Sequence, residues 1–119
     1  MPNLYAAQFA GRWIGETQGY DMPAHIWDIR VLGETLQIES RWEDETVQGR
    51  MSGKMLPDQA AFAIGNHTAV LVDAQHFIIR GWDTNDTRGG AGPDYDVVFS
   101  RPGLPELQAA EVWARYIAE

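Results

Sequence analysis

Apolar and polar residues alternate in short runs from residue 12 to residue 101, and turn-forming residues separate nearly every run. The alternation is clearest at 35–43, where Leu36, Ile38 and Trp42 fall on one face and charged or amide residues on the other. A period of two is typical of antiparallel strands with one buried face and one face in water. The pattern predicts eight strands, at residues 12–20, 25–32, 35–43, 46–56, 59–64, 67–72, 76–82 and 95–101.

The pattern changes at both ends of the chain. Residues 3–10 indicate a short helix or turn, and residues 103–118 carry apolar side chains three or four positions apart, the spacing of an amphipathic helix. A chain of 119 residues is expected to form one domain. A single meandering sheet buries its apolar face best by closing on itself. We therefore predict an all-β fold, an eight-stranded antiparallel up-and-down barrel at 12–101 with an N-terminal cap at 1–10 and a C-terminal helix.

Charge and composition narrow the functional classes. Seventeen acidic residues against nine basic ones give a formal net charge of −8, which repels phosphate backbones, so we expect no nucleic-acid partner. The absence of cysteine removes disulfides, thiolate metal sites and cysteine nucleophiles. No apolar run approaches the roughly 20 residues of a membrane helix, and the first residues lack a signal-peptide pattern. The expected location is the cytoplasm, without membrane contact.

Two short motifs stand at the beginning and the end of the barrel sequence. The first strand begins with Gly11-Arg12-Trp13, and the last strand ends at Arg101. Together with the meander of strands, they resemble the calycin, or lipocalin-like, superfamily of small β-barrels. The resemblance implies that Gly11, Trp13 and Arg101 close one end of the barrel, with the arginine lying across the tryptophan ring. A guanidinium over an indole contributes roughly 0.5–2 kcal/mol.

The longer stretch at 11–17 is also similar to the opening motif of the haem-binding nitrobindin-like barrels. Those proteins ligate haem iron through a histidine near the end of the chain, whereas no histidine follows His76 here. We therefore expect neither haem nor another cofactor.

The inward-facing side chains of the predicted barrel form the candidate binding site. Aromatic and methionine side chains make an adaptable apolar lining, and one serine supplies a polar group that orients a ligand. Glycines 15, 49, 53 and 81 also fall on inner faces, which favours a cavity over a filled core, the alternative for a narrow eight-stranded barrel. The polar loop at 83–93 is expected to cover the mouth. The candidate ligand-binding residues are Trp27, Ser40, Trp42, Met51, Met55 and Phe77.

The three histidines, His25, His67 and His76, come from separate predicted strands and lack the spacing of a metal site. We therefore expect no metal and place them at the surface or the rim. An acid–base role for His25 beside Asp28, or for His76 near Asp73, is an alternative. The segment 89–94 matches one copy of a calcium-binding β-roll repeat, but such sites need stacked copies, so we expect no calcium either.

These observations favour a non-enzymatic protein that binds a small apolar or aromatic molecule inside the barrel. One alternative is an enzyme of the isomerase, cyclase or lyase type, by analogy with other lipocalin-like barrels. Another is a filled-core interaction module that forms a homodimer through an exposed strand edge or the C-terminal helix. A polar group with a strongly perturbed pKa in the cavity would favour the enzyme, and an interior without a void would favour the module.

Overall fold

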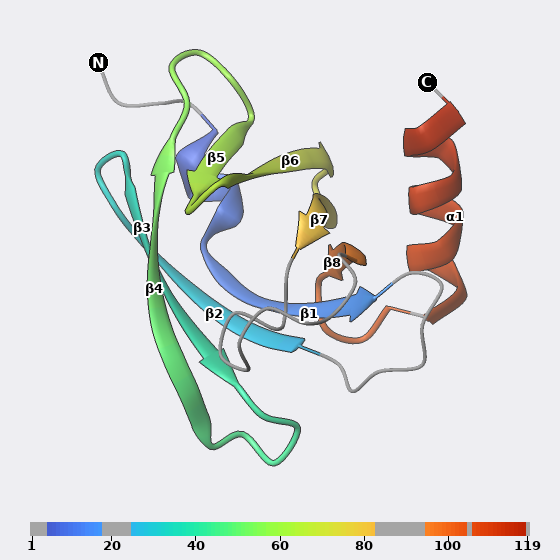
Figure 1. The fold of residues 1–119 in the computed structure, drawn as a ribbon, viewed down its shortest axis with the longest axis horizontal. Helices are drawn as coiled ribbons and strands as arrows, with labels where there is room; N and C mark the ends of the chain where they lie inside the picture. Colours follow the sequence, from blue (N-terminus) through green and yellow to red (C-terminus); the bar gives the residue numbers. More distant parts are fainter. Residues whose placement is uncertain (1–4, 18–24, 83–94, 105, 119) are drawn as a thin grey trace.

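The structure, a computed structural model, describes residues 5–17, 25–82, 95–104 and 106–118. Within these ranges, eight antiparallel strands follow one another in chain order and close into a barrel, because β8 pairs with both β7 and β1 (Figure 1). The predicted up-and-down barrel is confirmed. The elements are the 3-10 turn η1 (Ala6–Phe9), β1 (Gly11–Thr17), β2 (His25–Leu32), β3 (Thr35–Arg41), β4 (Val47–Met55), β5 (Ala61–Ile64), β6 (His67–Asp73), β7 (His76–Trp82), β8 (Tyr95–Ser100) and α1 (Glu106–Ala118).

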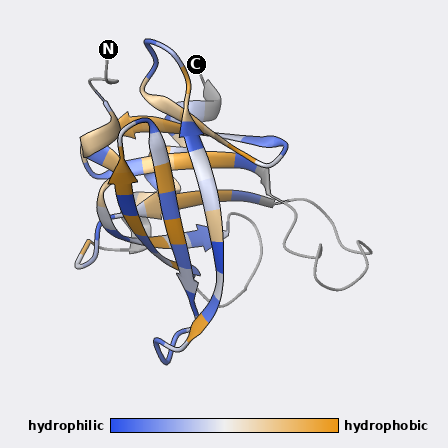
Figure 2. Ribbon diagram, turned by 90° about the vertical axis from the view of Figure 1, so that its left-hand side faces the viewer, coloured by the Kyte–Doolittle hydropathy of each residue, from blue (hydrophilic) through white to orange (hydrophobic). Residues whose placement is uncertain are grey.

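The strands follow the alternation in the sequence. Figure 2 shows this as apolar and polar bands that succeed one another along the strands on the β4 side of the barrel. Tight turns interrupt the strands at Gly33 and Gly65, whose φ angles of 65° and 57° glycine adopts at little cost. The element ends differ from the prediction by a few residues, since β5 starts at Ala61 and α1 at Glu106.

The inner faces of the strands pack into one apolar core, and η1 contributes to it. Phe9 of η1 is fully buried, with its ring centroid 4.9 Å from that of Phe62 and 5.6 Å from that of Phe77, both edge to face. Aromatic pairs of this geometry add about 0.5–1.5 kcal/mol beyond their buried area. We call the end that holds η1 the closed end. The opposite end, where β1 stops at Thr17 and β2 starts at His25, is the mouth.

Helix α1 covers the outer face of β7 and β8 (Figure 1). Ile78 and Val98 of the two strands pack against Ala109 and Val112 of the helix. All four side chains are buried. The helix has apolar side chains every three to four residues on one face, the strands have them at every second residue, and these two apolar faces pack together. The helix therefore forms a second, smaller core outside the barrel.

One histidine is buried on this outer face. His76 is 2% exposed, so its predicted surface or rim position is wrong, because α1 covers a face that a bare barrel leaves in water. Its Nδ1 lies 2.8 Å from Asp73 Oδ1, whereas its Nε2 and the hydroxyl of Ser100 have no hydrogen-bond partner. Burial raises the pKa of Asp73, but hydrogen bonds from His76 and from the backbone N–H of Gln75 outweigh it and leave that pKa lowered.

Strand β4 pairs unequally with its two neighbours. Its ladder with β3 runs along nearly the whole strand, whereas its described ladder with β5 consists of Lys54 opposite Ala63 and Met55 opposite Phe62. Residues 47–53 therefore have a strand partner on one side within the described sheet. This part of the barrel wall lies toward the mouth.

Candidate functional site

Arg101 holds the closed end together. Its Cζ lies 3.8 Å from the centroid of the Trp13 ring, and its two terminal nitrogens donate to the backbone carbonyls of Ala10 and Gln8, each at 2.8 Å. Gly11 has a φ of 105°, and a Cβ at this position would stand 2.9 Å from Nη1 of Arg101. The three residues that the lipocalin-like resemblance assigns to closure thus meet at one place. There they connect η1 with the first strand, β1, and with the end of the last strand, β8.

Three of the predicted ligand-binding residues lie in the packed core. The ring centroids of Trp27 and Phe99 are 4.3 Å apart, and Phe77 stacks on Phe99 at 4.6 Å. Met55 is buried opposite Phe62 in the ladder between β4 and β5. The side chains of Trp27, Met55 and Phe77 therefore pack against other side chains of the core.

The other three predicted residues lie nearer the mouth. Ser40 is buried, and its hydroxyl donates to Oε1 of Gln48 at 3.0 Å. Met51 is half-buried against the core. Trp42 is 52% exposed, so its predicted inward position is wrong. Strand β3 ends at Arg41, and Trp42 belongs to the hairpin that follows, where its carbonyl accepts from the backbone N–H of Glu45, so the strand alternation no longer applies to it.

Two buried polar atoms at the mouth have no hydrogen-bond partner among the residues that the structure describes, Nε2 of His25 and Oγ1 of Thr17. Alternation from the buried Trp27 and Gly15 places both side chains on the inner face. An unsatisfied buried polar group costs about 1–3 kcal/mol, so a water or a ligand group is favoured beside each atom. Thr17 is not among the residues predicted from the sequence to bind a ligand, although a polar residue at the inward position of a strand end is a usable signal.

The environment of His25 sets its protonation state. Burial lowers the pKa of His25 below its ordinary value of 6.5, because the low-dielectric interior disfavours the imidazolium. The ring is therefore neutral at pH 7, and Nε2 serves as a single donor or acceptor. Asp28 faces the opposite side of β2, so the predicted acid–base pairing with His25 is not formed.

Three inward glycines show where the interior is filled. A Cβ on Gly15 would lie 2.6 Å from the Phe99 ring, and a Cβ on Gly53 would lie 2.7 Å from the Phe62 ring. A Cβ on Gly49 would have no atom of the described residues within 4 Å. Gly49 is opposite Ser40 in the ladder between β3 and β4, one step from Met51 on the same face. The space beside the mouth is therefore open, whereas the two deeper positions are filled.

The remaining predictions for this region concern metal and the covering loop. No three histidine, aspartate or glutamate side chains in the described ranges gather in a way that would hold a metal ion. None of the described helices is long and apolar enough to cross a membrane. The loop at 83–93, predicted to cover the mouth, lies outside the described residues.

Among the described residues, the mouth thus has one open inward position, at Gly49, and two buried polar atoms without a hydrogen-bond partner. Among the described side chains, His25 has no carboxylate partner that would make it an acid–base pair.

No protein-family model matches the sequence, and no curated protein matches it. Among solved structures, the chain is similar to one described as a redesigned beta barrel, with a TM-score of 0.57 and 12% sequence identity over 83% of this chain and 96% of that chain. At this identity the similarity shows the fold alone, which is that of a small β-barrel.

Proposed function

We propose that this chain is a lipocalin-like small-molecule-binding barrel that holds an apolar or aromatic ligand in the mouth half of its interior. The proposal rests on two observations at the mouth within the described residues: the open inward position at Gly49 on β4, and the unpartnered buried atoms of His25 on β2 and Thr17 on β1. The lipocalin-like class is supported by the closure that Trp13 and Arg101 form at the other end.

The chemistry of the mouth defines the ligand class. A flat apolar body would lie toward the aromatic rings of Trp27 and Phe99, with Met51 as an adaptable wall. One uncharged hydroxyl, carbonyl or amide on the ligand would satisfy the neutral imidazole of His25 or the hydroxyl of Thr17. Burying roughly 200 Å² of apolar ligand surface provides about 5 kcal/mol.

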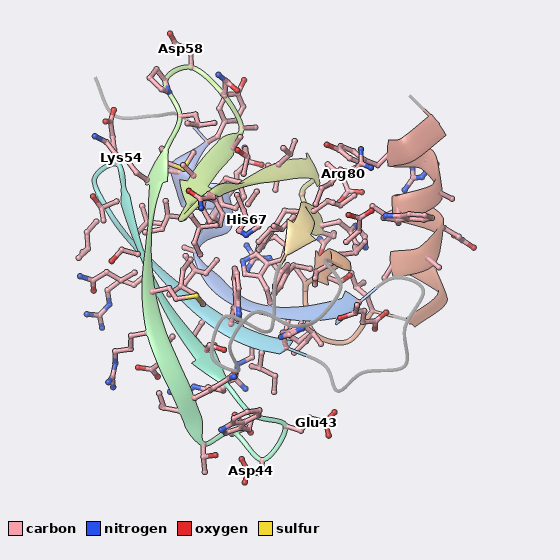
Figure 3. The ribbon with its side chains drawn as sticks, viewed as in Figure 1. Glu43, Asp44, Lys54, Asp58, His67 and Arg80 are labelled. Atoms are coloured by element: carbon pink, nitrogen blue, oxygen red, sulfur yellow. The ribbon has the colours of Figure 1, made fainter. Side chains whose placement is uncertain are left out.

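The rim of the mouth supports entry at this end. Trp42 and Val47 flank the β3–β4 hairpin, and both are exposed apolar side chains. Figure 3 shows Glu43 and Asp44 of this hairpin at the far end of the two strands. Exposed apolar residues beside an opening are typical of a ligand entrance.

The first test fills the open position. The uncharged aromatic probe N-phenylnaphthylamine should bind saturably to the parent protein, with a rise in probe fluorescence. Gly49→Leu should weaken this binding by about tenfold or more, because the new side chain occupies the space that the ligand needs. Thr68→Leu, an exposed position on β6, is the control and should bind as the parent does. If Gly49→Leu folds and binds equally well, the site is not here.

The second test examines the polar end of the site. Naphthol should bind more tightly than naphthalene to the parent, by about tenfold, because its hydroxyl satisfies a buried atom. In His25→Phe this preference should shrink while naphthalene binding is kept. Equal preference in parent and variant would remove His25 from the proposed site.

A further inference from the structure

The outer face of the first four strands carries an ordered set of charges. The strand registers align one row across the sheet, consisting of Arg12, Asp28, Glu39 and Arg50. Arg41, on the same face of β3, donates from Nε to Asp28 at 2.8 Å and from its guanidinium to Glu39. This face lies on the side of the barrel away from α1 (Figure 1).

Arginines saturate both acids of this row. Arg12 binds the two carboxylate oxygens of Asp28 at 2.8 and 3.0 Å, and these contacts are the main reason why the pKa of Asp28 is lowered. Glu39 accepts from both Arg41 and Arg50. Each of the two carboxylates therefore already pairs with two arginines, so neither is available to a further cation.

Two arginines keep unsatisfied donors. The Arg50 side chain is 75% exposed and makes one contact with Glu39, at 3.2 Å. Arg30, on the same face of β2, has no ion pair or side-chain hydrogen bond in the described part of the chain. Two guanidinium groups thus face solvent with most of their five donors each unused.

A groove connects these two arginines. It has a volume of about 750 Å³, and its polar lining includes Arg30, Gln37, Arg50 and Ser52. Arg30, Gln37 and Ser52 align in the register, and neighbouring strands are about 4.8 Å apart. An oxyanion above Gln37 is therefore within reach of guanidinium groups from both sides, with the amide and hydroxyl as further donors.

The charge of the whole chain makes the groove distinctive. Among the described residues, four of the nine basic residues line it with two acids, and Glu45 pairs with Arg12 beside it, although the chain has a net charge of −8. Lys54 follows on the same side of the barrel, whereas Arg80 lies on the side of α1 (Figure 3). An anion is repelled by most of this protein and attracted at this face.

We propose that the groove binds the oxyanion of a small ligand, a phosphate or carboxylate group, between Arg30 and Arg50. Gln37 and Ser52 donate hydrogen bonds to the same group. The salt-bridged Arg12, Asp28 and Arg41 form a rigid wall, so the site is organised before the anion arrives. This site is on the outer face and is independent of the interior ligand site.

The test is an NMR titration that follows the backbone amides and the arginine Nε–Hε signals, with inorganic phosphate or citrate added at constant ionic strength against chloride. Saturable shifts are expected at Arg30, Gln37, Arg50 and Ser52. Arg30→Gln and Arg50→Gln should each weaken binding about tenfold, the effect of losing a charge-assisted contact at a partly exposed site. Arg80→Gln, which removes an exposed arginine from the other side of the barrel, should leave the affinity unchanged.

A second variant changes the site in the opposite direction. Glu39→Gln frees donors of Arg41 and Arg50 and should tighten anion binding several-fold. Whether phosphate or citrate binds more tightly distinguishes the two oxyanion sources. The proposal is wrong if neither anion produces saturable shifts beyond those of chloride, or if Arg80→Gln reduces binding as much as Arg30→Gln. It is also wrong if the same signals move with protein concentration alone, because the face would then join two copies of the chain.

Discussion

The two ends of the barrel use polar atoms and space in opposite ways. At the closed end, Arg101 donates hydrogen bonds to the carbonyls of Gln8 and Ala10, and its guanidinium lies over the ring of Trp13. At the mouth, the buried polar atoms of Thr17 and His25 have no partner. A satisfied network beside filled space stabilises the fold, whereas unsatisfied atoms beside open space are suited to a molecule from outside. The comparison separates the part that maintains the barrel from the part where we propose that a ligand binds.

The largest expected effect is at the closed end. Trp13→Ala should lower the free energy of unfolding by about 3–5 kcal/mol, because a fully buried indole leaves a cavity and Arg101 loses its aromatic partner. Trp42→Ala, at the exposed rim, should change it by about 0.5 kcal/mol or less. Urea unfolding followed by circular dichroism measures both values. Similar losses in the two variants would contradict the division into two ends.

Two inward glycines, Gly15 and Gly49, give a second contrast, with a smaller expected change in the free energy of unfolding. Gly15→Ala forces a Cβ to within 2.6 Å of the Phe99 ring and should cost about 1–3 kcal/mol through overpacking. Gly49→Ala meets no atom within 4 Å and should be neutral or stabilising by about 0.5 kcal/mol, since it restricts the unfolded chain. Thermal and urea unfolding of the two variants test this prediction. A comparable loss at Gly49 would show that the mouth is packed.

The smallest expected effect is a dependence on pH. Because burial lowers the pKa of His25 in the folded protein, the unfolded chain binds a proton first as the pH falls through 6.5. The contribution of His25 to stability is thus complete above that pH and is lost below it. His25→Phe should show a smaller decrease in unfolding free energy between about pH 7.5 and pH 5.5 than the parent does. Equal slopes would mean that His25 is not held neutral by the fold.

Much of the fold was accessible from local patterns. Turn-forming residues such as Gly33 and Gly65 separate the strands, and the periods of two and of three to four identify strands and helix. The pairing of Gly11 and Trp13 with Arg101, implied by the resemblance, brings together residues at opposite ends of the barrel sequence. These features are readable because each depends on a few residues whose chemistry permits few alternatives.

The candidate sites were less accessible. Trp42 was predicted to face inward, but it lies in the hairpin after β3, where the strand alternation has ended. His76 was predicted to be exposed, but α1 covers the outer face of β7. The arginine groove combines residues from β1 to β4, and only the register shows which charges lie opposite one another.

By itself the sequence determined the barrel, because alternation and turn chemistry are local and one closed sheet is the economical way to bury a continuous apolar face. Tertiary structure alone decided which inward positions are filled. Gly15, Gly49 and Gly53 are identical in sequence terms, yet aromatic rings from β8 and β5 occupy the space beside two of them and leave the third open. The volume available to a residue depends on side chains that reach it from distant strands, and a local sequence pattern does not indicate which side chains these are.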